Sequence, residues 1–185
     1  MTTLTQRIFP LVSALLRSDS TPAQWQTFAL TTLRVVAGTV MIHNGLDKLG
    51  DISGFASAYV EVIGLPFPLF FAYVAALTEL VAAPLLILGL LTRPAALGLL
   101  STMAVAIYHH IKVAGLSIPY LELSTLYAGV FLLFTIQGAG SFSVDSLLAG
   151  MVTADQRQQQ IQSLNSSLQV TEQIIQSGAE SQVNS

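Results

Sequence analysis

Glu79 is an isolated carboxylate in an otherwise apolar stretch of the sequence. No other charged residue occurs between Glu61 and Arg93. The run from Leu65 to Leu91 is long enough to cross a bilayer, which takes about 20 apolar residues. A carboxylate near the centre of a membrane helix raises the free energy of insertion by about 2.5–3.5 kcal/mol. Glu79 therefore predicts a buried partner, a functional site, or both.

Arg34 is the predicted partner of Glu79. It lies about 12 residues, or about 18 Å, into a helix expected to begin at Pro22, and Glu79 lies about as far from the end of its own helix. Equal depth predicts an Arg34–Glu79 ion pair in the bundle interior. Two interpretations stay open. The pair fixes the register of the helices, or it forms a polar centre that binds a small polar or quinone-like ligand or carries protons.

A second group of titratable residues is expected near one membrane face, the face opposite the start of the first helix. It comprises His43, His109, His110 and Glu122, with Lys48, Lys112 and Tyr120 in the same layer. These residue types suit a proton relay, a quinone head-group site, or contacts with lipid headgroups. His43, one of the paired histidines and Glu122 would make a two-histidine, one-carboxylate metal set. No motif spacing supports that set, and we predict no metal site.

The composition indicates an integral membrane protein. Of 185 residues, 52% are hydrophobic and 9% are charged, whereas soluble domains have about 25% charged residues; the mean hydropathy is +0.66. The net charge of −3 argues against nucleic-acid binding. The chain has no cysteine, so any thiol or disulfide chemistry would belong to a partner or substrate.

The hydrophobic pattern predicts an all-α fold, an integral membrane four-helix bundle with short interfacial helices. The expected membrane helices span about residues 22–46, 69–91, 94–113 and 120–136. The very short connection at Leu91–Pro94 forces the second and third helices into an antiparallel hairpin. An amphipathic segment from Ile52 to about Ile63 is expected to lie on the membrane surface.

Three regions follow from this pattern. Residues 1–20 are expected to form an interfacial amphipathic segment or a mobile tail, and residues 21–148 the membrane domain. Residues 149–185 form a Gln- and Ser-rich tail, expected to be cytoplasmic and partly helical or disordered.

Arginine and lysine are distributed unevenly between the two predicted membrane faces. Arg7, Arg17, Arg93 and Arg157 fall on one side, against Lys48 and Lys112 on the other. The positive-inside rule then places both termini in the cytoplasm, for a multi-pass protein of the cell (plasma) membrane.

Several motifs together resemble the DoxX family over about residues 28–148. They are the run from Arg34 to Lys48, Gly64-Leu65-Pro66, Glu79, the run from Leu88 to Arg93, His109, Glu122, and the segment from Gly138 to Asp145. The resemblance implies a four-helix membrane protein associated with membrane redox systems, including subunits of quinone-reducing complexes. It adds Lys48, Arg93 and Asp145 as structural motif residues. Ala139 departs from the family's Gly-Pro-Gly turn.

The leading hypothesis is a membrane subunit or accessory of a quinone-linked redox complex, partnered by the bilayer and by redox-enzyme subunits. Its candidate ligand or proton-relay residues are Arg34, His43, Glu79, His109 and Glu122. A non-enzymatic scaffold or assembly protein is the alternative. A small-solute transporter is disfavoured because no inverted repeat is visible.

Overall fold

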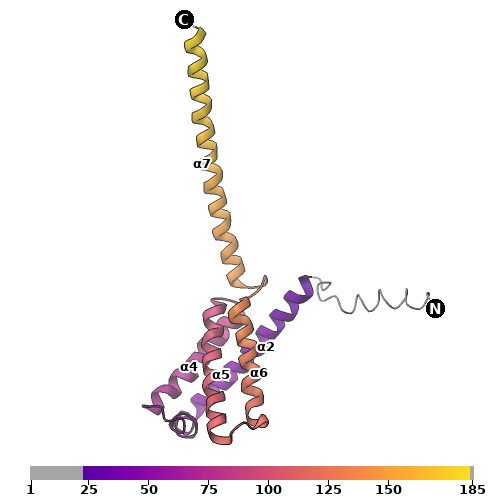
Figure 1. Ribbon diagram of the computed structural model, residues 1–185, viewed down its shortest axis with the longest axis vertical. Helices are drawn as coiled ribbons and strands as arrows, with labels where there is room; N and C mark the ends of the chain where they lie inside the picture. Colours follow the sequence, from indigo (N-terminus) through magenta and orange to yellow (C-terminus); the bar gives the residue numbers. More distant parts are fainter. Residues whose placement is uncertain (1–22, 184–185) are drawn as a thin grey trace, which may run out of the picture. The chain divides into compact units, whose positions relative to one another are not determined.

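The computed structural model describes residues 23–183, and all their regular secondary structure is helical (Figure 1). The all-α prediction is confirmed. The helices in chain order are α2 (Ala23–Gly50), α3 (Ile52–Phe55), the π-helix η2 (Ala56–Glu61), α4 (Pro68–Leu88), α5 (Thr92–Ala114), α6 (Ile118–Gln137) and α7 (Val144–Val183). The predicted interfacial segment 1–20 lies outside the described residues.

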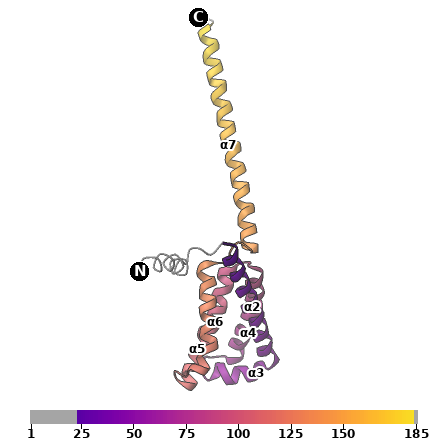
Figure 2. The same ribbon diagram turned by 90° about the vertical axis from the view of Figure 1, so that its right-hand side faces the viewer.

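Four long helices pack together around one apolar core. α2 packs on α4, α4 on α5, and α5 on α6 (Figures 1 and 2). Each contributes apolar side chains that are almost wholly buried, among them Met41, Leu86, Leu99, Phe131 and Phe134. The core is therefore shared by all four helices.

Two glycines bring α2 close to α4. A Cβ at Gly38 would lie 2.5 Å from Ile87 Cγ1 and 3.0 Å from the carbonyl oxygen of Ala83. A Cβ at Gly45 would lie 2.8 Å from Leu80 Cγ. Small residues permit close backbone approach between helices in lipid. These two contacts fix an antiparallel register in which the second half of α2 lies along α4.

The α4–α5 hairpin has the predicted short connection. α4 ends at Leu88 and α5 begins at Thr92. Gly89 adopts a left-handed conformation (φ 69°). Its N–H bonds to Leu86 O at 3.1 Å while Leu90 N–H bonds to Leu85 O at 2.9 Å. This paired pattern ends a helix and reverses the chain, and it favours glycine because glycine carries no Cβ.

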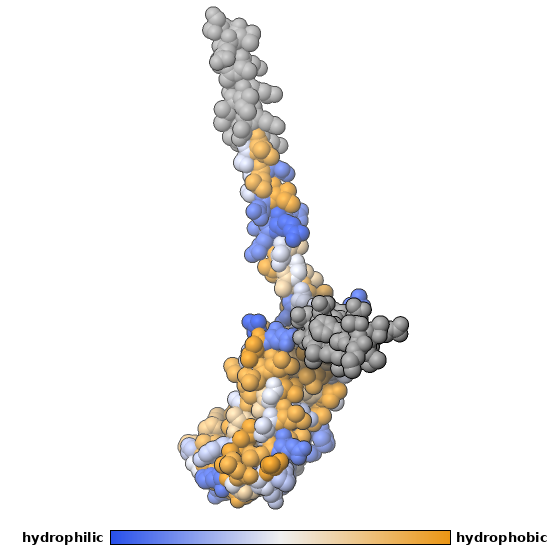
Figure 3. Space-filling view, turned by 45° about the vertical axis from the view of Figure 1, so that its right-hand side comes forward, coloured by the Kyte–Doolittle hydropathy of each residue, from blue (hydrophilic) through white to orange (hydrophobic). Residues whose placement is uncertain are grey.

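Three of the described helices, α4, α5 and α6, are long and apolar enough to cross a membrane. α2 does not reach that hydropathy, so its membrane crossing stays a prediction. Large apolar side chains cover the outside of the bundle, with Val81 61% exposed and Leu126 65% exposed. In Figure 3 the bundle surface is broadly hydrophobic, with hydrophilic residues gathered mainly toward its ends. Such a surface suits lipid and not water.

The segment after α2 is helical, as predicted, and its second half is a π-helix. Its location on the membrane surface stays a prediction. The Asp51 side chain caps α3 by accepting the Gly54 N–H at 2.9 Å. Ala56 and Val60 of η2 are buried and cluster with Ala72 of α4. π-helical turns are rare and often occur at functional sites. This short element closes one end of the space between the long helices.

α7 belongs to a second unit, which begins at Asp145. The tail from residue 149 is expected to be partly helical or disordered. In the structure it is helical up to Val183, as part of the 40-residue helix α7. Its side chains are exposed from Leu147 to Leu168.

Candidate functional site

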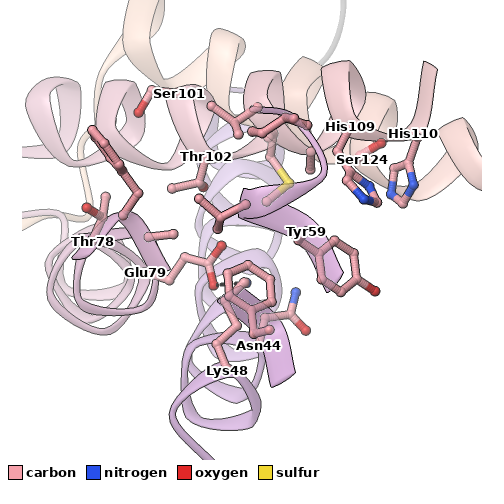
Figure 4. Close-up of a pocket in the computed structure, with 18 of the residues that line it drawn as sticks. Asn44, Lys48, Tyr59, Thr78, Glu79, Ser101, Thr102, His109, His110 and Ser124 are labelled. Atoms are coloured by element: carbon pink, nitrogen blue, oxygen red, sulfur yellow. Dashed lines mark hydrogen bonds and ion pairs between the residues drawn. The ribbon is translucent and has the colours of Figure 1, made fainter. Parts of the chain in front are cut away.

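Glu79 is buried in the middle of α4 and is paired with Lys48. Its side chain is 1% exposed, and its Oε2 accepts a hydrogen bond from the Lys48 ammonium (Figure 4). Lys48 lies near the C-terminal end of α2, and its side chain is 18% exposed. The Lys48 Nζ also lies 5.5 Å from the centroid of the Phe55 ring. Lys48 therefore supplies the counter-charge that a membrane-buried carboxylate needs.

The predicted Arg34–Glu79 pair is wrong. Arg34 Nη1 lies beside Gly89, at the α4–α5 turn. Glu79 precedes Gly89 by ten residues, about 15 Å along α4. The prediction counted the depth of Arg34 from the start of its helix and that of Glu79 from the end of its own helix, as though those two ends lay in one plane. Residues 23–33 of α2 instead extend past the end of α4, which shifts Arg34 to the turn and leaves Lys48 within reach of Glu79.

Arg34 instead holds the segment that follows α6. Its side chain is 3% exposed. Nη1 donates to Ala139 O and Nη2 to Phe142 O, both at 2.7 Å. A planar guanidinium can donate in two directions at once, which a lysine ammonium does less rigidly. The role of Arg34 is to fix this turn against α2 and Gly89.

The second carboxylate oxygen of Glu79 is buried without a hydrogen-bond partner in the described part of the chain. Thr102 of α5 lies beside it (Figure 4). The single hydroxyl proton of Thr102 is already donated to Leu99 O at 2.8 Å. An unpaired buried acceptor costs about 1–3 kcal/mol, and more when it is charged. Protein atoms enclose this oxygen, so the Glu79 carboxylate is held mainly through its other oxygen, by Lys48.

Glu79 lines a cavity of about 620 Å³ between α2, η2, α4, α5 and α6. Apolar side chains form much of its wall, including Val60, Ile63, Phe71, Met103 and Leu123. Its polar lining residues include Asn44, Lys48, Thr102, His109, His110 and Ser124, and three tyrosines also line it: Tyr59, Tyr120 and Tyr127. Binding sites for small ligands typically have volumes of about 300–1,000 Å³ and combine an apolar wall with a few polar groups. This cavity has that character.

His109 forms a second polar position of the same cavity. It is 7% exposed, and its Nε2 lies 3.1 Å from Ala58 O in η2. A carbonyl oxygen only accepts, so Nε2 carries the hydrogen, and Nδ1 of the neutral ring is an acceptor. Nδ1 is buried without a hydrogen-bond partner among the described residues. The ring packs on Tyr59, with centroids 4.6 Å apart.

His110 and Tyr120 continue the ring contacts toward the α5–α6 connection. The His110 ring lies 5.4 Å from that of His109 and 6.3 Å from that of Tyr120, between ring centroids. These contacts line one end of the cavity with aromatic rings. The Lys48–Glu79 pair lies at a distance from them in the same cavity, as Figure 4 shows.

The structure brings only some of the predicted polar residues together in one place. Glu79, Lys48 and His109 line the cavity. The His43 side chain is 72% exposed and lies 3.7 Å from the Asp47 carboxylate on α2. Glu122 lines a separate shallow groove whose residues all belong to α6. Within residues 23–183, no group of three or more histidine, aspartate or glutamate side chains could hold a metal ion.

The motif residue Arg93 does not line the cavity. Arg93 is the second residue of α5, and its Nε would be 3.6 Å from a Cβ at Gly138. Asp145 lies in the first turn of α7.

Sequence reasoning missed several cavity residues. Tyr59 falls in the amphipathic segment predicted from Ile52 to about Ile63, and Thr102, Asn44 and Ser124 are not among the predicted site residues. A signal was present for Asn44, because it precedes Lys48 by one helical turn and so shares its face. Thr102 and Ser124 have no distinguishing neighbours in the sequence.

Comparisons with known proteins agree with this architecture. The DoxX family model matches residues 29–112. A Haemophilus influenzae protein described as uncharacterized is 35% identical over 129 residues, covering 66% of this chain and 92% of that protein. The inner membrane protein YphA of Escherichia coli is 31% identical over 123 residues, which cover 63% of this chain and 87% of that protein. The chain belongs to the DoxX family.

A further relative of this DoxX-family protein is a membrane protein of Mycobacterium tuberculosis, also described as uncharacterized. It is 32% identical over 136 residues, which cover 66% of this chain and 82% of that protein. No solved structure matches. The family match includes Lys48, η2, Glu79 and His109. This DoxX-family chain is therefore a membrane protein whose family region contains the main polar residues of the cavity.

Proposed function

We propose that this DoxX-family protein binds the polar head of a lipid-soluble, quinone-type molecule and acts as a membrane subunit or accessory of a redox complex. One observation carries the proposal. A buried, ion-paired carboxylate, Glu79, lines a cavity of about 620 Å³ inside an apolar bundle. A ligand reaching this cavity from the bilayer would be mostly apolar with a few polar atoms, which matches the wall.

The cysteine-free sequence supports a role shared with partner subunits. With no cysteine in the chain, thiol or disulfide chemistry would have to be carried by another protein or by the substrate. The cavity supplies polar groups and aromatic walls to position a ligand. The protein would thus hold a membrane-soluble redox carrier while partner subunits deliver or receive electrons.

We also propose the plasma membrane as its location, with both termini in the cytoplasm. The Escherichia coli relative is described as an inner membrane protein. Arg93 lies at the same end of the bundle as the start of α2, and Lys112 at the opposite end. The excess of arginine that the sequence predicts for the first end supports a cytoplasmic location for that end.

A scaffold without a ligand is the second candidate. The Lys48–Glu79 pair joins α2 to α4. The two hydrogen bonds of Arg34 join α2 to the segment after α6. Buried polar contacts of this kind can specify one packing arrangement without binding anything.

Purification in mild detergent separates the two candidates. Mass spectrometry of the extracted lipids and of co-purifying proteins should find a quinone-type molecule and redox subunits with the wild type. Glu79→Gln should lose the small molecule, and Glu122→Gln should retain it because Glu122 lies on the outer groove of α6. If no ligand is found and Glu79→Gln only lowers thermal stability, the scaffold is correct.

A further inference from the structure

The helix α7 carries a row of uncovered apolar side chains. Ile161, Leu164 and Leu168 are 51%, 56% and 61% exposed. Hydrophobic side chains lie next to hydrophilic ones along the coloured part of this helix in Figure 3. Burial of exposed apolar surface is the main favourable term in most protein–protein association. The row is therefore a surface that a partner would stabilise.

The spacing of this row is that of a coiled coil. Leu164 follows Ile161 by three residues, Leu168 follows Leu164 by four, and Ile175 lies seven residues further on. These are positions a, d, a and a of a heptad, with Thr171 at the remaining d position. A repeat of 3.5 residues lets two helices keep one seam in contact. Isoleucine at a with leucine at d favours two parallel strands.

The sequence around the seam gives α7 little stability of its own. Three of its serines donate side-chain hydrogen bonds to backbone carbonyls three residues earlier, each at 2.8 Å: Ser163, Ser166 and Ser167. Bonds of this type compete with the helical backbone pattern. Helices in proteins owe most of their stability to packing of an apolar face. A 40-residue helix of this composition is thus expected to need a partner.

A membrane surface fits this helix less well than a second helix does. Interfacial helices carry many lysines and arginines on the polar face beside a broad apolar face. Residues 158–171 contain no lysine or arginine, and their apolar side chains lie mainly in the narrow a and d row. The stripe is therefore suited to a helix of matching spacing.

The absence of charge favours an identical helix as the partner. Residues 158–171 contain no charged residue. The positions that flank the seam, e and g, are Gln158, Gln160, Asn165 and Ser167. Charges at e and g normally set the choice of partner. Since none is present here, no like-charge repulsion opposes the pairing of two copies.

The connection to the membrane domain fixes the direction of such a pair. α7 begins at Val144, soon after the membrane-type helix α6 ends at Gln137. Copies with one membrane topology start α7 at the same face of the bilayer. Two such helices meet parallel and in register, so each seam residue meets its own counterpart.

We propose that the α7 seam, formed by Ile161, Leu164, Leu168 and Ile175, joins two copies of this protein in a parallel two-stranded coiled coil. The preceding d position is Arg157, so the seam is short. Confinement of both copies to one bilayer raises their effective concentration, which favours pairing through a short seam. The proposal does not depend on any ligand of the cavity.

Disulfide cross-linking of the full-length protein in native membranes tests this pairing. The chain has no cysteine, so single cysteines report one position each. Leu164→Cys places the thiol in the seam, and the control Ser166→Cys places it on the outer side of the same turn. After oxidation with copper phenanthroline, Leu164→Cys should give about fivefold or more covalent dimer than Ser166→Cys. Equal yields, or no dimer from Leu164→Cys, would overturn the proposal.

A charge added in the Leu164→Cys background shows whether the seam causes the cross-link. Ile161→Asp puts two like charges at one a position and should lower the dimer yield about tenfold. Ser163→Asp adds the same charge outside the seam and should leave the yield unchanged. An equal loss from both variants would contradict a specific seam. Cross-linking of Leu164→Cys to a protein of another mass, in place of the dimer, would also overturn the pairing of two copies.

Discussion

At the residue scale, the environments of two buried charges differ in kind. Glu79 is 1% exposed and depends on Lys48 for its counter-charge. Arg34 donates hydrogen bonds to two backbone carbonyls in the segment after α6. A lysine has a long flexible stem and can reach toward a membrane surface when its partner is removed, whereas the carboxylate at mid-helix cannot. The two members of the ion pair should therefore respond differently to substitution.

Removing Lys48 should destabilise the protein more than neutralising Glu79. Lys48→Met leaves a buried carboxylate without its partner and should cost about 3–5 kcal/mol. Glu79→Gln leaves a lysine that is already 18% exposed, and should cost less. The double variant should be more stable than Lys48→Met alone. Thermal unfolding in detergent measures all three, and equal melting temperatures for the two single variants would contradict this asymmetry.

Arg34→Lys should loosen the segment after α6 although it preserves the charge. A lysine ammonium does not reproduce the two fixed hydrogen bonds to Ala139 O and Phe142 O, so a loss of about 1–3 kcal/mol is expected. Limited proteolysis should cut residues 138–143 faster than in the wild type. An unchanged cleavage rate would show that the guanidinium does not fix this turn.

At the element scale, the close contact of α2 with α4 positions the ion pair. Gly38 and Gly45 let the two helices approach along the half of α2 that leads to Lys48. The sequence predicted helix positions well because apolar run length and short turns act locally. It did not predict how far α2 slides along α4, because that register depends on contacts between residues distant in the chain. The Arg34–Glu79 error arose at this step.

Gly38→Ala should weaken α2–α4 packing, and Gly129→Ala should not. The new Cβ at residue 38 would meet Ile87 Cγ1 at 2.5 Å and the Ala83 carbonyl oxygen at 3.0 Å. A Cβ added at Gly129 would meet no neighbouring atom within 4 Å beyond its own helical turn, so it would enter open space. Overpacking of this kind costs about 1–3 kcal/mol. Melting temperatures of the two variants, measured together in one detergent, check this. A matching loss for both would refute the close-contact explanation.

At the scale of the whole molecule, the bundle exposes apolar side chains outward and encloses polar groups. The sequence predicted the helical membrane class and named Glu79 and His109 as candidates. It did not separate them from His43 and Glu122, because residues at similar predicted depth face different sides of their helices. Only the packed arrangement shows which of these side chains share a cavity.

The absence of cysteine makes the orientation simple to measure. Single cysteines at Gln137 and Leu116 lie at opposite ends of α6 and are exposed. In intact cells, a membrane-impermeant maleimide should label Leu116→Cys and spare Gln137→Cys until the cells are opened. The reverse pattern would invert the proposed topology.

The most direct test of the central claim, a ligand cavity beside Glu79, is photoaffinity mapping. A photoreactive phenol with an alkyl tail would be cross-linked to the wild-type protein, and the modified residues located by mass spectrometry. The account predicts label on cavity residues such as Met103, Tyr59 and Tyr127, abolished by excess unlabelled hydroquinone. Label confined to outward residues such as Val81, Leu97 and Leu126, and insensitive to competitor, would contradict it.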